Sequence, residues 1–192
     1  MSINKSFSRL SKSHKSVEYE TPKDFFDKLN SIFHFELDPC TSPDNPLGTK
    51  YYFTNESPGF DGLVQEWSVN TFINPPFGRN IADWIHKMKM SYDSYNKDYV
   101  MLLPARVDTE WFQTKIWERC PFKDQFIYFV KGRLKFKNAE HNPKNQPHNI
   151  GTMLWILLQN TPVNQKERYS KLKILEKYIP GILIDWRNKR YD

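Results

Sequence analysis

The sequence predicts an α/β fold in which helices flank a sheet of buried strands. Two near-continuous apolar runs, 99–104 and 152–158, are typical of strands that are covered on both faces. A third short run of β-branched and aromatic residues, 69–73, stops at the pair Pro75-Pro76. Segments with helical periodicity, 80–92 and 166–178, follow two of these runs. Helices interleaved with buried strands are typical of the α/β class.

Composition indicates one domain and a polyanionic partner. The chain has 192 residues, 39% of them hydrophobic, which is enough for a single core. Residues 1–16 are rich in Ser and Lys and predict a flexible basic tail, so the domain is expected at 17–192. No apolar run approaches the ~18 residues of a membrane span, and no secretory signal is evident, which favours the cytoplasm. The formal charge of +6 favours a polyanion.

The cysteine pattern gives no sign of a metal. Cys40 and Cys120 lie far apart and have no paired Cys or His spacing. This argues against both a zinc site and a disulfide framework.

The first element is expected to be a helix that begins near Thr21. Thr21 has the chemistry of an N-cap, and Pro22 suits the first helical position. Phe25, Phe26 and Leu29 then fall on one helical face.

Two short strands and a turn are expected before the central strand. A strand-like alternation at 33–38 ends at Asp38-Pro39, and 51–53 predicts a short second strand. Asp61 opens an Asp-Gly turn. An acidic residue at a strand end, or before a glycine, is often only a turn former, and ligand binding is the alternative.

The residues Asn74, Pro75, Pro76 and Phe77 predict a rigid ledge at the carboxyl end of strand 69–73. Each proline keeps the residue before it out of the helical region, and neither has an N–H with which to continue the strand. In open α/β sheets, ligands bind at the carboxyl ends of the strands. An amide side chain, backbone carbonyls and an aromatic ring are therefore expected at a ligand-binding edge.

These groups suit a planar amine. The Asn74 side-chain oxygen and the Pro75 carbonyl can each accept one N–H of an exocyclic amino group. Such bonds draw the nitrogen lone pair out of conjugation and make the amine a better nucleophile, while Phe77 stacks on its ring. A plain Pro-Pro turn, in which Asn74 caps the next helix, explains the same residues.

Basic and aromatic residues interleave after the strand expected at 125–130. Lys131-Gly132-Arg133 predicts a turn into a second strand at 134–136, so that the two strands form a hairpin. Cations that bracket Phe136 suit nucleic acid, because charge meets phosphate and a ring stacks on a base. Core packing of Phe136 is the alternative.

Two further cations follow predicted elements of the sheet. Arg79 comes after the ledge and can meet a phosphate. Arg106 comes after strand 99–104 and, with Asp108, can line the site. A solvated Arg79, and a loop ion pair between Arg106 and Asp108, are the alternatives. Asp108 or Thr109 is expected to cap a helix that includes 111–117.

Five short motifs occur in a fixed order: Thr21-Pro22, Asp38-Pro39-Cys40, Asp61-Gly62-Leu63 with Trp67 after it, Asn74–Phe77, and Gly132–Phe136. Together they resemble the phage-type, Dam-like DNA N6-adenine methyltransferases over about residues 18–158. The resemblance implies a trimmed Rossmann-like, S-adenosylmethionine-dependent methyltransferase fold with a mixed, mostly parallel sheet flanked by helices. It also implies methyl transfer to N6 of a flipped-out adenine in double-stranded DNA, by a phage- or prophage-encoded protein in the bacterial host cytoplasm.

The resemblance further implies roles for individual residues. The catalytic residues would be Asn74, Pro75, Pro76 and Phe77. The cofactor would be bound by Tyr19, Thr21, Pro22, Asp38, Pro39, Cys40 and Asp61, with Thr21-Pro22 at its methionine and Asp61 at its adenine amino group. The DNA would be met by Arg79, Arg106, Lys131, Arg133 and Phe136. One departure from the family pattern is that no glycine-rich turn follows Asp38.

Two other functions agree with the same residues. The ledge suits other planar amines, such as cytosine N4, an RNA adenine or a protein glutamine. A DNA-binding module that kept the ledge but lost the cofactor pocket is the non-enzymatic alternative.

Overall fold

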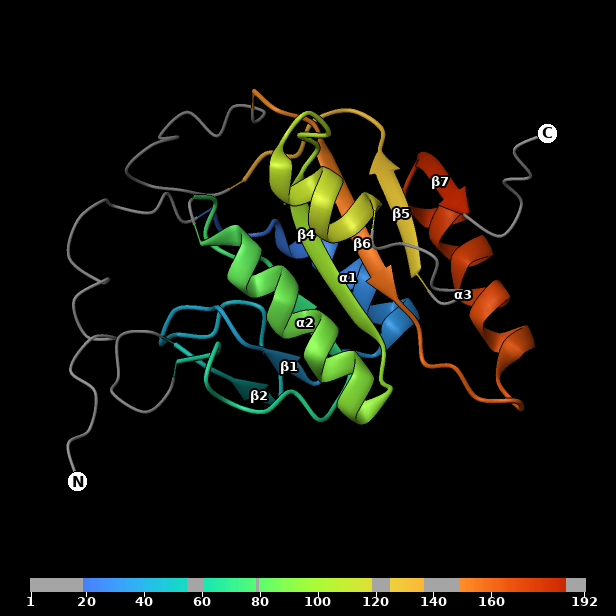
Figure 1. The fold of residues 1–192 in the computed structure, drawn as a ribbon, viewed down its shortest axis with the longest axis horizontal. Coiled ribbons are helices and arrows are strands. Elements are labelled where there is room, and N and C mark those ends of the chain that lie inside the picture. Colours follow the sequence, from blue (N-terminus) through green and yellow to red (C-terminus); the bar gives the residue numbers. More distant parts are fainter. Residues whose placement is uncertain (1–18, 55–60, 79, 119–124, 137–148, 186–192) are drawn as a thin grey trace.

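The chain folds into a seven-stranded mixed sheet with helices on both faces (Figure 1). The computed structural model describes residues 19–54, 61–78, 80–118, 125–136 and 149–185. The strand order is β2-β1-β3-β4-β6-β5-β7. Strands β1 to β5 run in one direction, whereas β6 and β7 run in the opposite one. The strands are β1 (Leu37–Asp38), β2 (Tyr51–Tyr52), β3 (Thr71–Ile73), β4 (Tyr99–Pro104), β5 (Gln125–Val130), β6 (Thr152–Leu157) and β7 (Gly181–Asp185).

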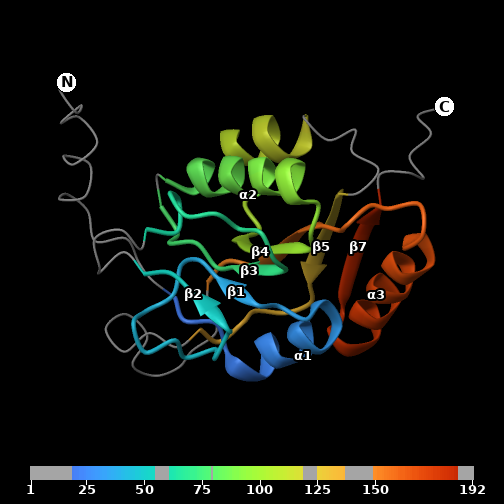
Figure 2. The ribbon, with the colours of Figure 1, turned by 90° about the horizontal axis from the view of Figure 1, so that it is seen from below.

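Two helical layers cover the sheet, as Figure 2 shows. Helices α1 (Lys23–Phe33) and α3 (Gln165–Tyr178) lie on one face, and α2 (Ile81–Tyr95) with the π-helix η2 (Trp111–Trp117) lies on the other. The sheet residues alternate between two buried cores. Phe72 and Tyr128 pack toward α1 and α3, whereas Met101 and Trp155 pack toward α2 and η2.

The centre of the sheet is fully buried. All six residues of β4 and all six of β6 are buried, and the two strands pair antiparallel from Tyr99–Leu157 to Pro104–Thr152. Continuous apolar runs form strands here because both faces are covered. None of the helices in the described ranges has the length and hydrophobicity of a membrane span.

The expected hairpin after β5 does not form. Both edges of β5 are already paired, one with β6 and the other with β7. Residues 131–136 therefore leave the sheet as an irregular segment, and Phe136 is buried at its end.

Three other expected boundaries differ. The run 33–38 is not one strand, because α1 continues through Phe33 and ends at a left-handed His34, leaving only Leu37 and Asp38 in β1. Thr21 does not cap α1, whose N-cap is Pro22, since the Thr21 hydroxyl bonds to another side chain. Neither Asp108 nor Thr109 caps η2. The N-cap is Glu110, without a side-chain cap bond.

The path of the chain through the sheet reverses between β1 and β3. The chain begins the sheet at β1, adds β2 on one side, and then places β3 on the other side of β1. All three strands are parallel, so their carboxyl ends lie at one edge. A crevice outside such a reversal is where open α/β sheets bind ligands. The fold therefore draws attention to the residues that end β1 and β3.

Candidate active site

Asp38 and Asn74 flank the point where the strand order reverses. Asp38 is the last residue of β1, and Asn74 follows the last residue of β3 directly. Strands β1 and β3 are hydrogen-bonded neighbours, so these two side chains belong to adjacent strand ends. The motifs that the sequence placed at two separate strand ends thus lie at one edge of the sheet.

The Asn74 side chain is held by the segment that precedes α1. Its Nδ2 atom donates to the carbonyl oxygen of Tyr19 at 2.5 Å and to the hydroxyl oxygen of Thr21 at 3.0 Å. A carbonyl oxygen can only accept, so the NH₂ end of the amide must face Tyr19. These two bonds fix the orientation of the amide.

The oxygen of the same amide has no donor. Asn74 Oδ1 is buried and accepts no hydrogen bond within the described part of the chain. A buried acceptor without a partner costs about 1–3 kcal/mol, and native proteins keep few of them. An oriented acceptor at a ligand-binding edge is the arrangement that a ligand's N–H or O–H completes.

The ledge is more enclosed than the sequence predicted. Pro75 is buried, and Asn74, Pro76 and Phe77 are half-buried. The Tyr19–Thr21 segment contacts the ledge through the Asn74 bonds and through the Tyr19 ring, which covers Phe77. Sequence reasoning missed this contact, because the partners lie more than 50 positions apart along the chain.

Three aromatic rings cluster beside the ledge. The Tyr19 ring lies 5.4 Å from Phe77 and 5.6 Å from Phe136, between ring centroids. Phe77 and Phe136 are 6.1 Å apart and nearly perpendicular, at 84°. A base held between two parallel rings needs about 7 Å, because each stacking contact takes about 3.5 Å. In this conformation, Tyr19 fills the space next to the two rings that the sequence suggested as stacking walls.

Asp38 places a buried carboxyl at the end of β1. Its side chain is 3% exposed, and its Oδ1 accepts a bond from the Cys40 backbone N–H at 3.2 Å. Burial raises the pKa of Asp38 to about 7, although hydrogen bonds from Cys40 and Thr41 partly oppose the shift. A carboxylate in such a place gains from a ligand that brings hydroxyl donors or positive charge.

The turn at Asp61-Gly62-Leu63 packs closely against Pro39, just after β1. Gly62 is buried, and a Cβ atom built on it would lie 1.8 Å from the Pro39 carbonyl oxygen. The turn is closed by a bond from the Leu63 N–H to the Asp61 side chain at 2.9 Å. It is anchored below by buried Trp67, whose Nε1 donates to the Gly62 carbonyl at 2.8 Å. Asp61 and Pro39 are thereby brought to the same end of the sheet.

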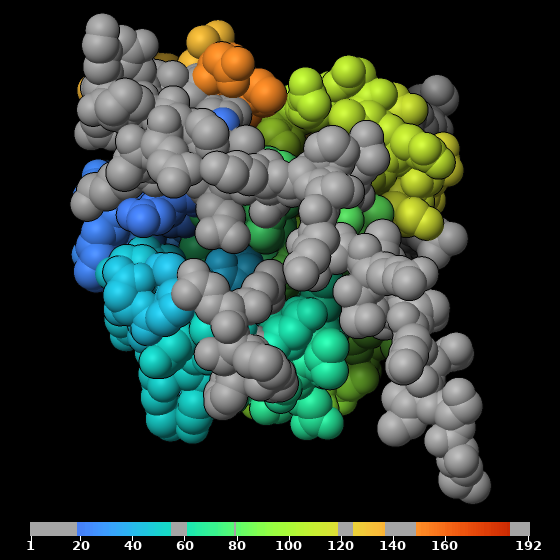
Figure 3. Space-filling model, turned by 90° about the vertical axis from the view of Figure 1, so that its left-hand side faces the viewer, coloured from blue at the N-terminus to red at the C-terminus, as the bar shows by residue number. Residues whose placement is uncertain are grey.

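Figure 3 faces this side of the molecule, where the segment after β1 (cyan) and the turn at 61–67 (turquoise) both reach the surface. The sequence left a turn and ligand binding as alternatives for the Asp61-Gly62 pair. The contact with Pro39 shows that Gly62 is also needed for close packing, because any side chain would meet backbone atoms.

We expect Gly62→Ala to lower the free energy of unfolding by about 1–3 kcal/mol and to weaken ligand binding at this edge. The Pro39 backbone and the Asp61 turn must move apart to admit the added methyl group. Chemical denaturation and calorimetry measure the two effects. Gly151→Ala is the matched control, since its Cβ would meet only the Ala105 methyl group at an ordinary 3.6 Å. If the two variants have the same unfolding free energy and the same ligand affinity, the close packing of Gly62 against Pro39 is contradicted.

The remaining residues suggested by sequence are spread over this edge and beyond it. Arg106 is exposed just past β4, and Lys131 and Arg133 are exposed past β5. Cys40 and Pro22 are half-buried. Arg79 and the tail 1–16 lie outside the described residues. No group of three or more His, Cys, Asp or Glu side chains is placed to hold a metal ion in the ranges that are described.

A model of a known protein family matches most of the chain. A family model described as DNA N-6-adenine-methyltransferase (Dam) matches residues 8–176. No curated protein sequence matches the chain significantly.

Among solved structures, the chain is similar to the crystal structure of protein LPL1258 from Legionella pneumophila str. Philadelphia 1. The two are 14% identical with a TM-score of 0.38, over 73% of this chain and 54% of that one. The chain thus spans about half the length of that protein, and so low a TM-score carries no weight for the fold.

Proposed function

Because the chain belongs to the DNA N-6-adenine-methyltransferase (Dam) family, we propose that it methylates N6 of an adenine flipped out of DNA, with S-adenosylmethionine as the methyl donor. An adenine inside the duplex keeps N6 in its base pair, out of reach of a methyl donor. Flipping exposes the amine at a cost of a few kcal/mol.

The observation that carries the proposal is the oriented oxygen of Asn74, which has no hydrogen-bond donor among the described residues. Its amide NH₂ is held by Tyr19 and Thr21, so Oδ1 is the end left to accept a hydrogen bond. In the proposed complex, Oδ1 and the Pro75 carbonyl each accept one N6–H of adenine. The lone pair of N6 then leaves conjugation with the ring and becomes available for bond formation. After transfer, N6 releases its extra proton to water.

The cofactor would be held at the reversal of strand order. Asp38 and the Asp61 turn offer acceptors for the hydroxyl and amino groups of a nucleoside, and the buried Asp38 carboxylate favours a cationic ligand. S-adenosylmethionine supplies a methyl group activated by a positively charged sulfur. The chain's own part is to align the acceptor amine and exclude water.

The aromatic cluster suggests how the base is received. Tyr19, Phe77 and Phe136 pack on one another, and the base needs the place next to Phe77. The Tyr19 ring turns aside when adenine arrives, and the base replaces its contacts with the other two rings. The fold supports the same assignment, since the reversal between β1 and β3 is the ligand-binding feature of Rossmann-like sheets.

The proposal is tested with methyl-tritiated S-adenosylmethionine and equal amounts of duplex DNA, RNA and protein. The expected result is that DNA becomes labelled, and that the label is recovered after digestion as N6-methyldeoxyadenosine. Label in N4-methylcytosine, in RNA or in a protein amide would reassign the acceptor. If the cofactor binds but no methyl group is transferred, or if the cofactor does not bind at millimolar concentration, the proposed methyltransferase activity is contradicted.

Substitution of Thr21 distinguishes two possible roles for the segment before α1, namely positioning Asn74 and binding the cofactor. If it positions Asn74, Thr21→Val removes one acceptor for Nδ2 and lowers kcat by roughly five- to fifteen-fold, the value of about one hydrogen bond. Cofactor affinity would stay the same. If Thr21 instead holds the methionine of the cofactor, calorimetry would show weaker cofactor binding. Thr21→Ser keeps the hydroxyl and is expected to retain the wild-type kcat.

A further inference from the structure

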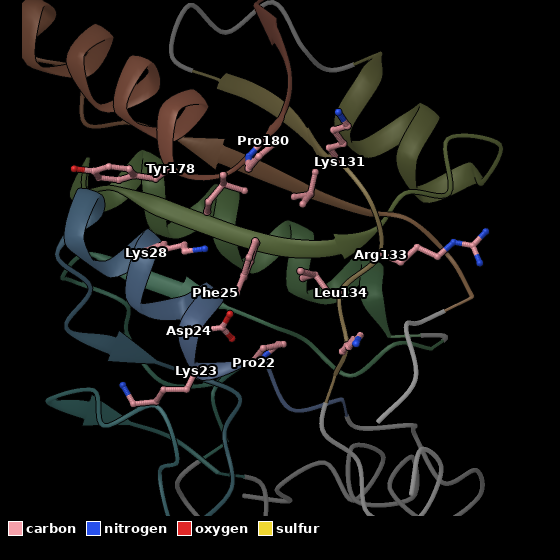
Figure 4. Close-up of a pocket in the computed structure, with 13 residues that line it drawn as sticks. Pro22, Lys23, Asp24, Phe25, Lys28, Lys131, Arg133, Leu134, Tyr178 and Pro180 are labelled. Carbon is pink, nitrogen blue, oxygen red and sulfur yellow. The ribbon is translucent and has the colours of Figure 1, made fainter. Parts of the chain in front are cut away.

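A groove of about 660 Å³ opens beside the candidate site, on the α1 and α3 face of the sheet (Figure 4). Its walls are the first turns of α1, the segment that follows β5, and the chain between α3 and β7. The carboxyl end of β5 lies at the same edge as the ends of β1 and β3, because these strands are parallel. The groove therefore opens at the edge where Asn74 lies.

The rim of the groove is cationic. Lys28 extends from α1 toward the groove, and Lys131 and Arg133 lie across from it (Figure 4). These three side chains and that of Lys135 are exposed, and none pairs with an acidic residue that the structure describes. Lys23 is already paired with Asp27 at 2.6 Å. Among the described residues that line the groove, Asp24 is the only acidic one.

The floor of the groove is apolar. It includes Phe25 from α1, Leu134 from the segment after β5, and Ile179 between α3 and β7. A strand of nucleic acid has this mixed character, with charged phosphates along one side and an apolar sugar face along the other. Free phosphate or a small dianion would use the rim and leave the floor uncovered.

The cationic segment leads directly to the aromatic cluster. Lys131, Arg133 and Lys135 are followed by Phe136, whose ring contacts Tyr19 and Phe77 at the ledge. From 131 to 136 the chain can span at most about 16–18 Å. Each DNA strand carries one phosphate per about 3.4 Å of helix axis, so the segment can follow several phosphates next to a base held at Asn74.

We propose that this groove binds the phosphate backbone of the DNA strand next to the flipped adenine, through Lys28, Lys131, Arg133 and Lys135. The inference depends on the proposed function, which supplies DNA as the partner, and it adds a second contact surface formed by α1 and the segment after β5. These cations bind phosphates without reading base sequence, so they raise affinity and fix the position of the duplex.

The test compares two triple variants of the full chain. Lys28→Ala, Lys131→Ala and Arg133→Ala together remove three rim charges. Lys115→Ala, Lys166→Ala and Lys173→Ala together remove three exposed charges that do not line the groove. The dissociation constant for a fluorescent 20-base-pair duplex is measured by anisotropy at several salt concentrations, with cofactor binding followed by calorimetry.

Loss of three phosphate contacts lowers the slope of log K against log salt by about 2.7, which corresponds to an affinity loss of up to about 500-fold at 0.1 M salt. The expected result is a loss of at least about tenfold with a shallower slope for the groove variant. Less than about threefold is expected for the control, and both keep wild-type cofactor affinity.

If the two triple variants have equal DNA affinity and equal salt slopes, the proposal that this groove binds DNA is wrong. If such variants still methylate DNA, the proposed function stands without it. Groove-dependent binding of poly-L-glutamate, with no groove-dependent binding of DNA, would instead assign the surface to an acidic protein. A wild-type protein that methylates nothing and binds no DNA would remove both proposals together.

Discussion

Asn74→Ala is expected to reduce methyl transfer to DNA by roughly 10²–10³-fold, the range seen when one preorganised hydrogen-bonding group is removed from an active site. In the proposed complex, the variant would lack the oriented acceptor for N6, so the amine would keep its lone pair in conjugation. Cofactor affinity should stay near the wild-type value. Single-turnover kinetics with labelled cofactor measure the chemical step directly.

Asn70→Ala is the matched control. Asn70 directly precedes β3 and Asn74 directly follows it, and each amide makes two hydrogen bonds to distant parts of the chain. Asn70→Ala should therefore lose about 1–3 kcal/mol of unfolding free energy, and Asn74→Ala should lose less, because it also removes the buried oxygen that has no donor among the described residues. Only Asn74→Ala should lose the methyl-transfer rate. A near wild-type rate in Asn74→Ala would remove the amide from the mechanism.

Asp38→Asn is expected to make the protein more stable above pH 7 and a weaker binder of its cofactor. Burial raises the pKa of Asp38 to about 7, whereas an unfolded Asp has a pKa of about 3.9. The folded carboxyl thus holds a proton that the unfolded one releases between about pH 4 and 7. The contribution of Asp38 to the free energy of unfolding therefore falls as pH rises through that window. Above pH 7 the buried carboxylate is ionised, and the full cost of burying its charge is present.

Asn at position 38 carries no charge, so the variant avoids this cost. A shift of about 3 pKa units corresponds to at most about 4 kcal/mol, and a gain of about 1–3 kcal/mol at pH 8 is expected. The gain should vanish near pH 4. Urea unfolding at the two pH values measures it, with exposed Asp83→Asn as a control that changes little. A loss of stability at pH 8 in Asp38→Asn would contradict the burial cost.

Cofactor binding should follow the opposite trend. If the ionised Asp38 receives the cofactor, wild-type affinity at pH 6 is about tenfold weaker than at pH 8, because most molecules must first lose a proton. Asp38→Asn should bind more weakly at pH 8 and lose this pH dependence. Calorimetry across the pH range makes the measurement, and identical profiles for the two proteins would exclude Asp38 from the cofactor site.

Sequence patterns located the central elements well, because their signals are long and strongly periodic. The run 99–104 is β4 with the expected bounds, and 152–158 is β6 within one residue. The helices expected at 80–92 and 166–178 are α2 (Ile81–Tyr95) and α3 (Gln165–Tyr178). The sequence also predicted that Asp38 and Asn74 lie at strand ends, and the structure brings both to one edge because β1 and β3 are parallel.

Tertiary contacts decided what the sequence left open or misplaced. Residues 134–136 have strand-like composition, but β5 has no free edge to pair with them. Thr21 has the chemistry of an N-cap, yet its hydroxyl oxygen accepts a hydrogen bond from the Asn74 amide nitrogen. Gly62 looked like an ordinary turn residue, and only the position of the Pro39 carbonyl shows why it has no side chain. Each of these depends on a partner distant along the chain.

The most direct test of the account is a map of modified bases in DNA from cells that have no other adenine methylation. The cells would express either the wild-type chain or Asn74→Ala. We predict N6-methyladenine at one short recurring sequence with the wild-type chain, and unmodified DNA with the variant. DNA that stays unmodified with both chains, or adenine methylation that persists in Asn74→Ala, would contradict a methyltransferase built around the Asn74 oxygen.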